Sequence, residues 1–294
     1  MYLEFFGLHK PPFRITPDTT AFFGGADRGA LLNALCYAIS QGEGITKVVG
    51  EVGSGKTMLC RMLPLTLNGK IDWVYLAHPS LSPEHTLHAI AQEMGLKVDS
   101  NSNKLTVMQM LHEALLEKHR ENRQVVVLVE EAQSMPLETL EEIRLLTNLE
   151  TGDYKLLQLV LFGQPELDEK LANPSIRQLR ERITHSLYLT PLELPDIQAY
   201  LNFRLRSVGY AGPDLFSKKV AAAIGYYSQG LIRRINILAD KTLLVAFTKD
   251  SHDINVKDVR YVAQDSQFKP MSSSMNWVQF LYHRLLLGIK GLMQ

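Results

Sequence analysis

The stretch Gly50-Glu-Val-Gly-Ser-Gly-Lys56-Thr57 decides the fold of this chain. It matches the phosphate-binding loop pattern G-x-x-x-x-G-K-[ST] at every fixed position. The apolar run 45–49 before it predicts a short buried strand, and residues 57–63 after it predict a helix. Because strand, glycine-rich turn and helix follow in this order, the stretch predicts a phosphate site rather than a turn with a chance lysine.

The residue types in this loop suit a bound phosphate. Glycines let backbone N–H groups curl around an anion without a side-chain clash, and the positive end of the next helix adds to that field. Lys56 is expected to reach the β- and γ-phosphates of ATP, and the Thr57 hydroxyl is expected to ligate Mg²⁺. The expected contacts to ATP or ADP are Gly50, Glu51, Val52, Gly53, Ser54, Gly55, Lys56, Thr57 and Met58.

The composition limits the class of protein. The 294 residues allow one large or two small domains, and 31 basic residues balance 31 acidic ones. A net charge of zero argues against a protein that mainly wraps nucleic acid, although it leaves room for a local basic patch. We see no signal peptide and no run of about 20 apolar residues, and the two cysteines have no metal-site spacing. These features predict a cytoplasmic protein.

Strand and helix patterns alternate through the first two thirds of the chain. Strand-like runs cover 45–49, 72–77, 124–130, 156–162 and 185–190, and helical patterns cover 27–41, 56–67, 83–94, 105–121 and 136–149. Such alternation predicts an α/β fold, in which helices cover both faces of a parallel sheet. Residues 26–191 are therefore expected to form the phosphate-loop core.

The pattern changes after Pro191. Helical patterns at 194–208, 214–227, 231–248 and 255–265 follow one another without strands, and they predict an all-helical lid over 192–268. Asn255 is expected to cap the last of these helices, with Asp258 three residues on. Residues 1–25 are rich in proline and phenylalanine, which predicts an ordered arm laid on a domain.

The C-terminal residues 269–294 are expected to form a flexible joint and then an amphipathic helix from Met275 to Gln294. Their charges are Lys269, Arg284 and Lys290, with no acid. Three placements stay open: an anionic membrane surface, a partner helix, or the chain's own lid. Peripheral attachment to the inner membrane would be encoded in this segment.

Two carboxylates, Glu130 and Glu131, follow the apolar run 124–129. Acids at the end of a buried strand are costly unless a cation or hydrogen-bond donors meet them. In phosphate-loop enzymes this position carries the acid associated with Mg²⁺, so Glu130 is expected near the metal. Glu131 is expected to orient the attacking water and to help deprotonate it. The alternative is a solvated strand end that opens a helix.

Further motifs carry a resemblance to a known family. They include Phe5-Phe6-Gly7-Leu8, Glu131-Ala132-Gln133, the run Leu161-Phe-Gly-Gln-Pro-Glu-Leu167, Arg182-Ile183, and the run Gly230-Leu-Ile-Arg-Arg-Ile-Asn236. With the phosphate loop, these stretches resemble the AAA+ ATPases of the ExeA/GspA type from bacterial secretion and pilus systems. The resemblance runs from about residue 4 to residue 265. Within it, the run 135–150 and the chain length are most similar to the ATPases of MSHA-type IV pilus biogenesis.

The resemblance implies roles for three more residues. Gln164 is placed like sensor 1, which contacts the γ-phosphate or the lytic water. Arg182 occupies the arginine-finger position and would act on a neighbouring subunit's nucleotide, with Arg177 and Arg180 as alternatives. Arg233 matches sensor 2, with Arg234 as the alternative. The ordinary interpretation of these residues is a loop glutamine and solvated arginines.

Two positions depart from the family pattern. The family usually has Asp-Glu where this chain has Glu130-Glu131, and the extra methylene displaces the first carboxylate by about 1.5 Å. Slow hydrolysis or a changed metal preference follows from that displacement unless a water-mediated Mg²⁺ contact absorbs it. Ile232 stands where the family often has proline, which predicts only a smoother helix start.

The resemblance implies a Mg²⁺-dependent ATPase that works as a ring or another nucleotide-dependent homo-oligomer, with pilus or secretion proteins as partners. A DNA-associated AAA+ helper is the second hypothesis, but the charge balance supplies no basic face for it. A scaffold that binds ATP and barely hydrolyses it is the third hypothesis, because of Glu130.

Overall fold

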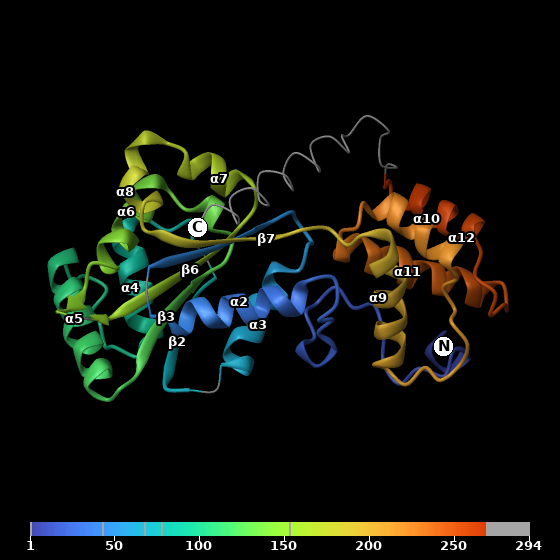
Figure 1. The fold of residues 1–294 in the computed structure, drawn as a ribbon, viewed down its shortest axis with the longest axis horizontal. Helices are drawn as coiled ribbons and strands as arrows, with labels where there is room; N and C mark the ends of the chain where they lie inside the picture. Colours follow the sequence, from blue (N-terminus) through green and yellow to red (C-terminus); the bar gives the residue numbers. More distant parts are fainter. Residues whose placement is uncertain (1, 43, 68, 78, 153, 269–294) are drawn as a thin grey trace, which may run out of the picture. The chain divides into compact units, whose positions relative to one another are not determined.

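The computed structural model describes residues 2–42, 44–67, 69–77, 79–152 and 154–268. Within that range the chain forms two compact units. Residues 14–191 together with 231–233 form an α/β unit, and residues 2–13, 192–230 and 234–268 form a helical unit (Figure 1). The amphipathic helix expected at 275–294 lies outside the described residues.

A five-stranded parallel sheet organises the α/β unit. Its strands are β1 (Ile45–Gly50), β2 (Ile71–Leu76), β3 (Gln124–Val129), β6 (Leu157–Gly163) and β7 (Ile183–Leu189), in the order β2-β3-β6-β1-β7. The crossover connections bring the carboxyl ends of all five strands to one edge, so the phosphate loop after β1 and the acids after β3 share that edge. The parallel sheet expected from the alternating pattern is confirmed.

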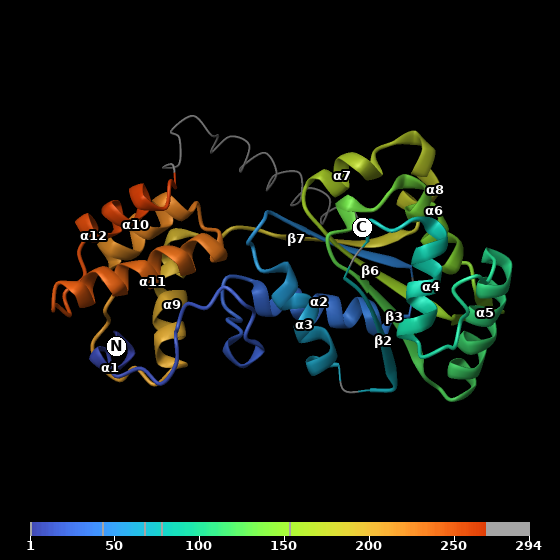
Figure 2. The same cartoon turned by 180° about the vertical axis from the view of Figure 1, so that it is seen from behind.

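Helices cover both faces of this sheet (Figure 2). Two helices, α2 (Arg28–Ser40) and α3 (Lys56–Thr66), pack on one face. The other face carries α4 (Pro83–Glu93), α5 (Lys104–Arg120), α6 (Leu137–Leu146) and α7 (Glu166–Leu171). The side chains of β3 alternate between the two apolar clusters, since successive strand residues point to opposite faces. Both faces are therefore buried, as the continuous apolar run of β3 indicates.

The segment after α6 differs from the sequence pattern. The helix expected over 136–149 ends at Leu146, and a two-stranded antiparallel hairpin follows, made of β4 (Glu150–Thr151) and β5 (Tyr154–Lys155). Two short helices, α7 and α8 (Arg177–Arg180), lie between β6 and β7. Strands of two residues and helices of four to six residues are too short to give a periodic signal.

Four helices make up most of the helical unit: α9 (Leu194–Arg206), α10 (Lys218–Ser228), α11 (Ile232–Thr248) from its third residue on, and α12 (Val256–Asp265). A full capping box starts α12, because Asn255 accepts from the Asp258 N–H and the Asp258 carboxylate accepts from the Asn255 N–H. That cap is confirmed.

The amino-terminal segment packs on these helices. Its short helix α1 (Tyr2–Phe5) places the Tyr2 hydroxyl 2.7 Å from Oδ1 of Asp240. Arg204 donates from Nε to the carbonyl of Pro12, at 2.8 Å. Residues 2–13 of the expected arm thus belong to the helical unit, and the rest of it, from residue 14, belongs to the α/β unit.

Candidate nucleotide site

The phosphate loop connects the end of β1 to the start of α3. Gly53 and Gly55 have φ angles of +79° and +111°, which side chains other than glycine's rarely allow. At Gly50 a Cβ would lie 2.7 Å from Ser54 Oγ and 2.9 Å from the carbonyl oxygen of Leu189. The pattern's two fixed glycines, Gly50 and Gly55, and the additional Gly53 therefore have separate steric reasons, and the loop keeps its backbone free of side chains.

Lys56 starts α3 and folds back over the loop. Its Nζ donates to the carbonyl of Gly50 at 2.7 Å and to that of Glu51 at 3.1 Å. Burial lowers the pKa of Lys56, although the carboxylates around it, Glu131 foremost, act in the opposite direction. A buried ammonium group held on two carbonyls is placed to meet an anion over the loop.

The remaining loop residues differ in exposure. Ser54 is fully buried, and its Oγ has no hydrogen-bond partner among the described residues. Val52 is half exposed, and Glu51 is exposed as well. Thr57 and Met58 lie in the first turn of α3, at the positive end of that helix, although the Met58 N–H itself donates to the carbonyl of Gly55 at 3.0 Å. All nine expected contact residues therefore lie in the loop or the first turn after it.

Glu130 follows β3 at the same edge of the sheet. Tyr75 on β2 pairs with Leu128, so its side chain shares a face with Glu130, and Cys60 of α3 packs in the apolar cluster on that face. Burial raises the pKa values of Tyr75 and Cys60, and the adjacent Glu130 raises both further. Oε1 of Glu130 is buried and lacks a hydrogen-bond partner within the described residues.

Glu131 adopts the left-handed conformation, with φ at 52°. Its Oε2 accepts hydrogen bonds from Nε2 of Gln133 at 2.7 Å and from Nε2 of Gln164 at 2.8 Å. Burial alone would raise the pKa of Glu131, but these two hydrogen bonds and the charges of Lys56 and Arg233 lower it overall. The carboxylate is thus held ionised next to the phosphate loop. Gln164, expected at sensor 1, lies directly beside it.

The two candidate sensor 2 arginines lie in different surroundings. The backbone N–H of Arg233 donates to the carbonyl of Gly53 at 3.1 Å, and its positive charge acts on both Lys56 and Glu131. Arg234 instead donates to the side chain of Gln229 and lies over the ring of Phe268. Arg233 is therefore the arginine that the structure brings to the phosphate loop.

Arg182 lies at the amino-terminal ends of the strands, opposite the phosphate loop. It precedes β7, and its carbonyl accepts from the N–H of Ile45 at the start of β1. The six residues of β1 place the phosphate loop roughly 17 Å away, beyond the reach of an arginine side chain. Within one chain, Arg182 is therefore not brought together with the other predicted site residues.

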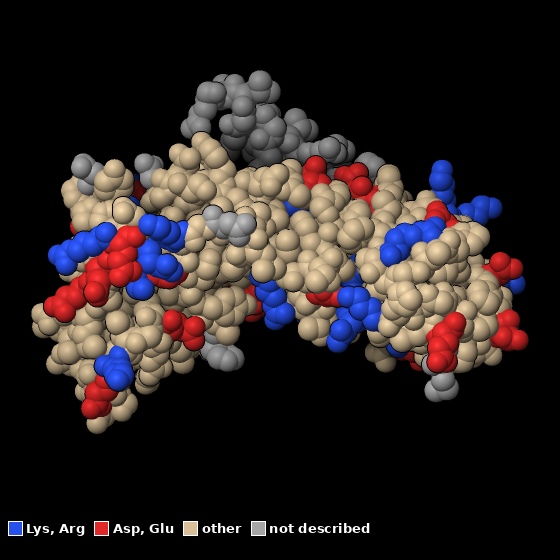
Figure 3. All heavy atoms as spheres, turned by 90° about the horizontal axis from the view of Figure 1, so that it is seen from below, with Lys and Arg blue, Asp and Glu red and all other residues tan. Residues whose placement is uncertain are grey.

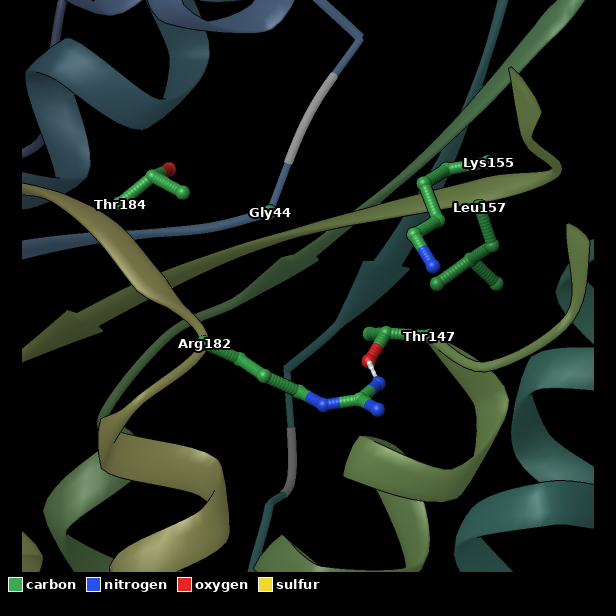
Figure 4. Close-up of a pocket in the computed structure, with 6 residues that line it drawn as sticks. All are labelled: Gly44, Thr147, Lys155, Leu157, Arg182 and Thr184. Atoms are coloured by element: carbon green, nitrogen blue, oxygen red, sulfur yellow. Dashed lines mark hydrogen bonds between the residues drawn. The ribbon is translucent and has the colours of Figure 1, made fainter. Parts of the chain in front are cut away.

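A pocket of about 300 Å³ surrounds the Arg182 side chain. Its Nη1 donates to Oγ1 of Thr147 at 3.1 Å, and Lys155 of the β4–β5 hairpin lines the same pocket (Figure 4). Of the alternatives, Arg177 pairs with Glu181 on the surface, and Arg180 is exposed. Arg182 is thus the one that lines this pocket.

Three residues of the site were missed by the sequence reasoning. Tyr75 and Cys60 flank Glu130, and the Gln133 side chain contacts Glu131. For Gln133 the signal was present, since Glu131-Ala132-Gln133 is one of the motifs that carry the family resemblance. For Tyr75 and Cys60 the sequence holds no comparable signal, because their approach to Glu130 depends on the register of β2 with β3 and on the packing of α3.

The residues present fit a magnesium ion. A buried carboxylate oxygen without a donor is costly, and an oxygen-liganded divalent cation removes that cost. Glu130 supplies such an oxygen through Oε1, and Thr57 brings a hydroxyl in the first turn of α3. Both are hard oxygen ligands of the kind that Mg²⁺ prefers when it also binds phosphates.

Comparisons with known proteins agree with this geometry. Residues 39–171 match the family model of an AAA domain. This range of the chain includes the phosphate loop, both acids and Gln164. General secretion pathway protein A of Aeromonas hydrophila is 38% identical over 265 residues, which cover 90% of this chain and 48% of that protein. The chain thus spans about half the length of this relative.

Solved structures share the fold at low identity. The ORC2 protein of Aeropyrum pernix, in ADPNP–ADP complexes, has a TM-score of 0.65 at 14% identity and covers 88% of this chain and 74% of its own. Cdc6p of Pyrobaculum aerophilum has a TM-score of 0.65 at 16% identity, and the match covers 84% of this chain and 71% of the Cdc6p chain. The RuvB branch migration motor of Thermotoga maritima has a TM-score of 0.57 at 17% identity, and the match covers 86% of this chain and 73% of the RuvB chain. These likenesses show the fold, including the helical region after the sheet.

Proposed function

We propose that this chain, an AAA+ ATPase of the ExeA/GspA type, hydrolyses ATP with Mg²⁺ to control the assembly of a secretion system or an MSHA-like type IV pilus. The observation that supports hydrolysis most directly is the arrangement around Glu131. An ionised carboxylate, held by two amides, lies at the same edge of the sheet as the phosphate loop. That is the arrangement required of a group that accepts a proton from water.

Each residue has a separate part in the proposed reaction. The loop N–H groups and Lys56 bind the phosphates of ATP and offset the charge that develops on the γ-phosphoryl group. Glu130 and Thr57 would hold Mg²⁺, which would supply positive charge to neutralise the phosphates of ATP. Glu131 takes the proton of the attacking water while Gln164 orients that water, and Arg233 adds positive charge beside the γ-phosphate. The products are ADP and phosphate.

Arg182 is proposed to complete the site of a neighbouring subunit. It is too far from its own phosphate loop to act there, and it lies in a pocket open to an incoming group. A guanidinium at this place stabilises the transferring phosphoryl group of the neighbour. This role requires a homo-oligomer, in which each copy supplies its Arg182 edge to the nucleotide edge of the next.

The partners are proposed from the relative's printed name. The similarity to a general secretion pathway protein supports partners in a secretion system, and the resemblance of the run 135–150 supports the MSHA-like pilus. No helix among the described residues is both long and apolar enough to cross a bilayer. We place the protein in the cytoplasm. Residues 269–294 are the candidate segment for peripheral attachment to the inner membrane, and a partner helix and the chain's own lid are its other placements.

The DNA-associated alternative is less well supported. Figure 3 shows one face of the molecule, on which basic and acidic side chains are interleaved rather than gathered by sign. Nonspecific binding to DNA requires a cluster of basic residues, and binding then weakens steeply with salt. The ATP-binding scaffold is the stronger alternative, since Glu130 replaces the family's aspartate.

ATP turnover measured against protein concentration tests the proposal, with Glu131→Gln as the variant and Glu138→Gln, an exposed acid on α6, as the matched control. We expect turnover per subunit to rise with concentration. Glu131→Gln is expected to lower turnover about 10²- to 10⁴-fold and to keep ATP affinity. Tight ATP binding without turnover in the wild type would instead support the scaffold.

A further inference from the structure

The side chain of Gln133 joins two parts of the nucleotide site. Its Nε2 donates to Oε2 of Glu131 at 2.7 Å, and its Oε1 accepts from the backbone N–H of Gln164 at 3.1 Å. Gln164 closes the triangle, because its own Nε2 donates to the same Oε2 of Glu131 at 2.8 Å. One amide therefore fixes both the carboxylate and the loop that follows β6.

The main chain of Gln133 is held as well. It lies in the short helix η2 (Ala132–Ser134), and its carbonyl accepts from Nζ of Lys170 at 2.5 Å. The same Nζ donates to the carbonyl of Met135 at 2.6 Å. Lys170 belongs to α7, which begins two residues after Gln164. The segment that carries Gln133 is thus tied to the helix that carries the Gln164 loop.

We propose that Gln133 is a positioning residue, which orients the Glu131 carboxylate for the attacking water and links that carboxylate to Gln164. The proposal rests on the hydrolytic role of Glu131 proposed above. Gln133 does not touch the nucleotide in this account. It acts through Glu131 and through the backbone of Gln164.

The hydrogen bonds explain why such a residue is needed. Both amide donors reach Oε2 of Glu131, while Oε1 makes no hydrogen bond within the described residues. One oxygen is thereby anchored and the other is left to accept a proton. Glu131 is in the left-handed conformation, which a residue with a Cβ rarely adopts, and the two amide donors hold its side chain in place on that backbone.

The first test needs no nucleotide. Hydrogen exchange of the Gln164 amide is measured in the full-length protein for wild type, Gln133→Ala and Gln133→Glu, with Gln92→Ala on the surface of α4 as the control. Gln133→Ala removes the acceptor, so the Gln164 amide is expected to exchange about fivefold to tenfold faster. Gln133→Glu keeps an acceptor at that place and is expected to keep the protection. Unchanged exchange in Gln133→Ala would overturn the link.

The second test separates turnover from binding. Gln133→Ala and Gln133→Glu both lose the donor to Glu131, so kcat is expected to fall about tenfold to a hundredfold while ATP affinity stays at the wild-type value. In a Glu131→Gln background, Gln133→Ala is expected to have no further effect on kcat, because the two residues act as one unit. Equal fold losses in both backgrounds would overturn the positioning role.

The two tests also distinguish this proposal from the proposed function. A wild-type protein without turnover contradicts the hydrolytic function and with it the role of Gln133 in orienting water. The exchange measurement would still report whether Gln133 links Glu131 to Gln164. Faster exchange in Gln133→Ala with kcat unchanged would leave the link as architecture and would overturn its part in catalysis.

Discussion

Carboxylates at the amino ends and at the carboxyl ends of the parallel strands have different partners. Asp72 lies near the start of β2, where Arg123 and Lys118 meet it; Nε of Arg123 is 2.9 Å from Oδ2, and Nη2 bonds the other oxygen. Glu130 follows β3 at the far edge, and its buried Oε1 has no hydrogen-bond partner within the described residues. Asp72 bonds cations of the chain through both of its oxygens, whereas Glu130 keeps one buried oxygen without a partner in the part of the chain that the structure describes, even though the charge of Lys56 acts on it.

This difference separates an architectural charge from a functional one. Removing a carboxylate oxygen from water without a partner is costly, so such an oxygen beside the phosphate loop is a candidate for a partner from outside the chain. At the carboxyl edge that partner is the proposed Mg²⁺ and its nucleotide. At the amino edge the charges of Asp72, Arg123 and Lys118 offset one another.

Arg182 also lies at the amino edge, but among the described residues its guanidinium is not paired with a carboxylate as Arg123 is with Asp72. The hydrogen bond of Arg182 goes to the neutral hydroxyl of Thr147, and its charge contributes to lowering the pKa of the Glu150 carboxylate only after the closer Lys155.

Replacement of Arg182 is expected to give the largest loss of ATP turnover. If a neighbour's nucleotide is its partner, Arg182→Ala lowers turnover about a thousandfold while each subunit still binds ATP. Arg120→Ala, at the exposed end of α5, is the matched control, and Arg180→Ala tests the alternative finger. Full ATP turnover by Arg182→Ala would contradict the role in a neighbour's site and would leave Arg182 with a structural role only.

Lys56 tests the carboxyl edge. Lys56→Met removes the buried ammonium group that rests on the carbonyls of Gly50 and Glu51, so we expect ATP affinity to fall about a hundredfold. Lys97→Met, at an exposed position, is the control, and calorimetric titration measures both. Affinity retained in Lys56→Met would mean that the loop backbone alone binds the phosphates.

Replacement of Asp72 is expected to give the smallest effect, and to change the stability of the fold rather than ATP binding or turnover. The hydrogen bond from Arg123 is the main cause that lowers the pKa of Asp72, and burial opposes it. A carboxylate with a lowered folded-state pKa contributes stability at neutral pH, and that contribution is lost as the pH falls through the folded pKa. Asp72→Asn is therefore expected to be less stable than wild type at pH 7 and to approach it in acid, with ATP turnover unchanged. Thermal unfolding over that pH range measures it.

Much of the nucleotide edge was predictable, because its signals are local. The phosphate loop, the strand before it and the helix after it lie within about twenty consecutive residues, and the pattern specifies their chemistry. The acids after β3 were predictable for the same reason. Backbone rules for parallel strands then place both at one edge of the sheet.

The rest depends on packing between distant segments. The sequence did not predict the hairpin at 150–155, whose two-residue strands carry no pattern. It indicated three arginines near 182, and only the folded chain shows which one lies in a pocket. The link from Gln133 to Gln164 joins residues that are 31 positions apart, through a side chain whose direction no periodicity reveals.

The most direct test is the Mg²⁺ dependence of ATP binding in wild type, Glu130→Gln and Asp72→Asn. Calorimetric titration with and without Mg²⁺ gives the gain in affinity that the metal provides. We predict that Glu130→Gln loses that gain, by about tenfold or more, and keeps the metal-free affinity, while Asp72→Asn behaves as wild type. A Glu130→Gln protein with the full Mg²⁺ gain would contradict the claim that this carboxylate is reserved for a cation from outside the chain.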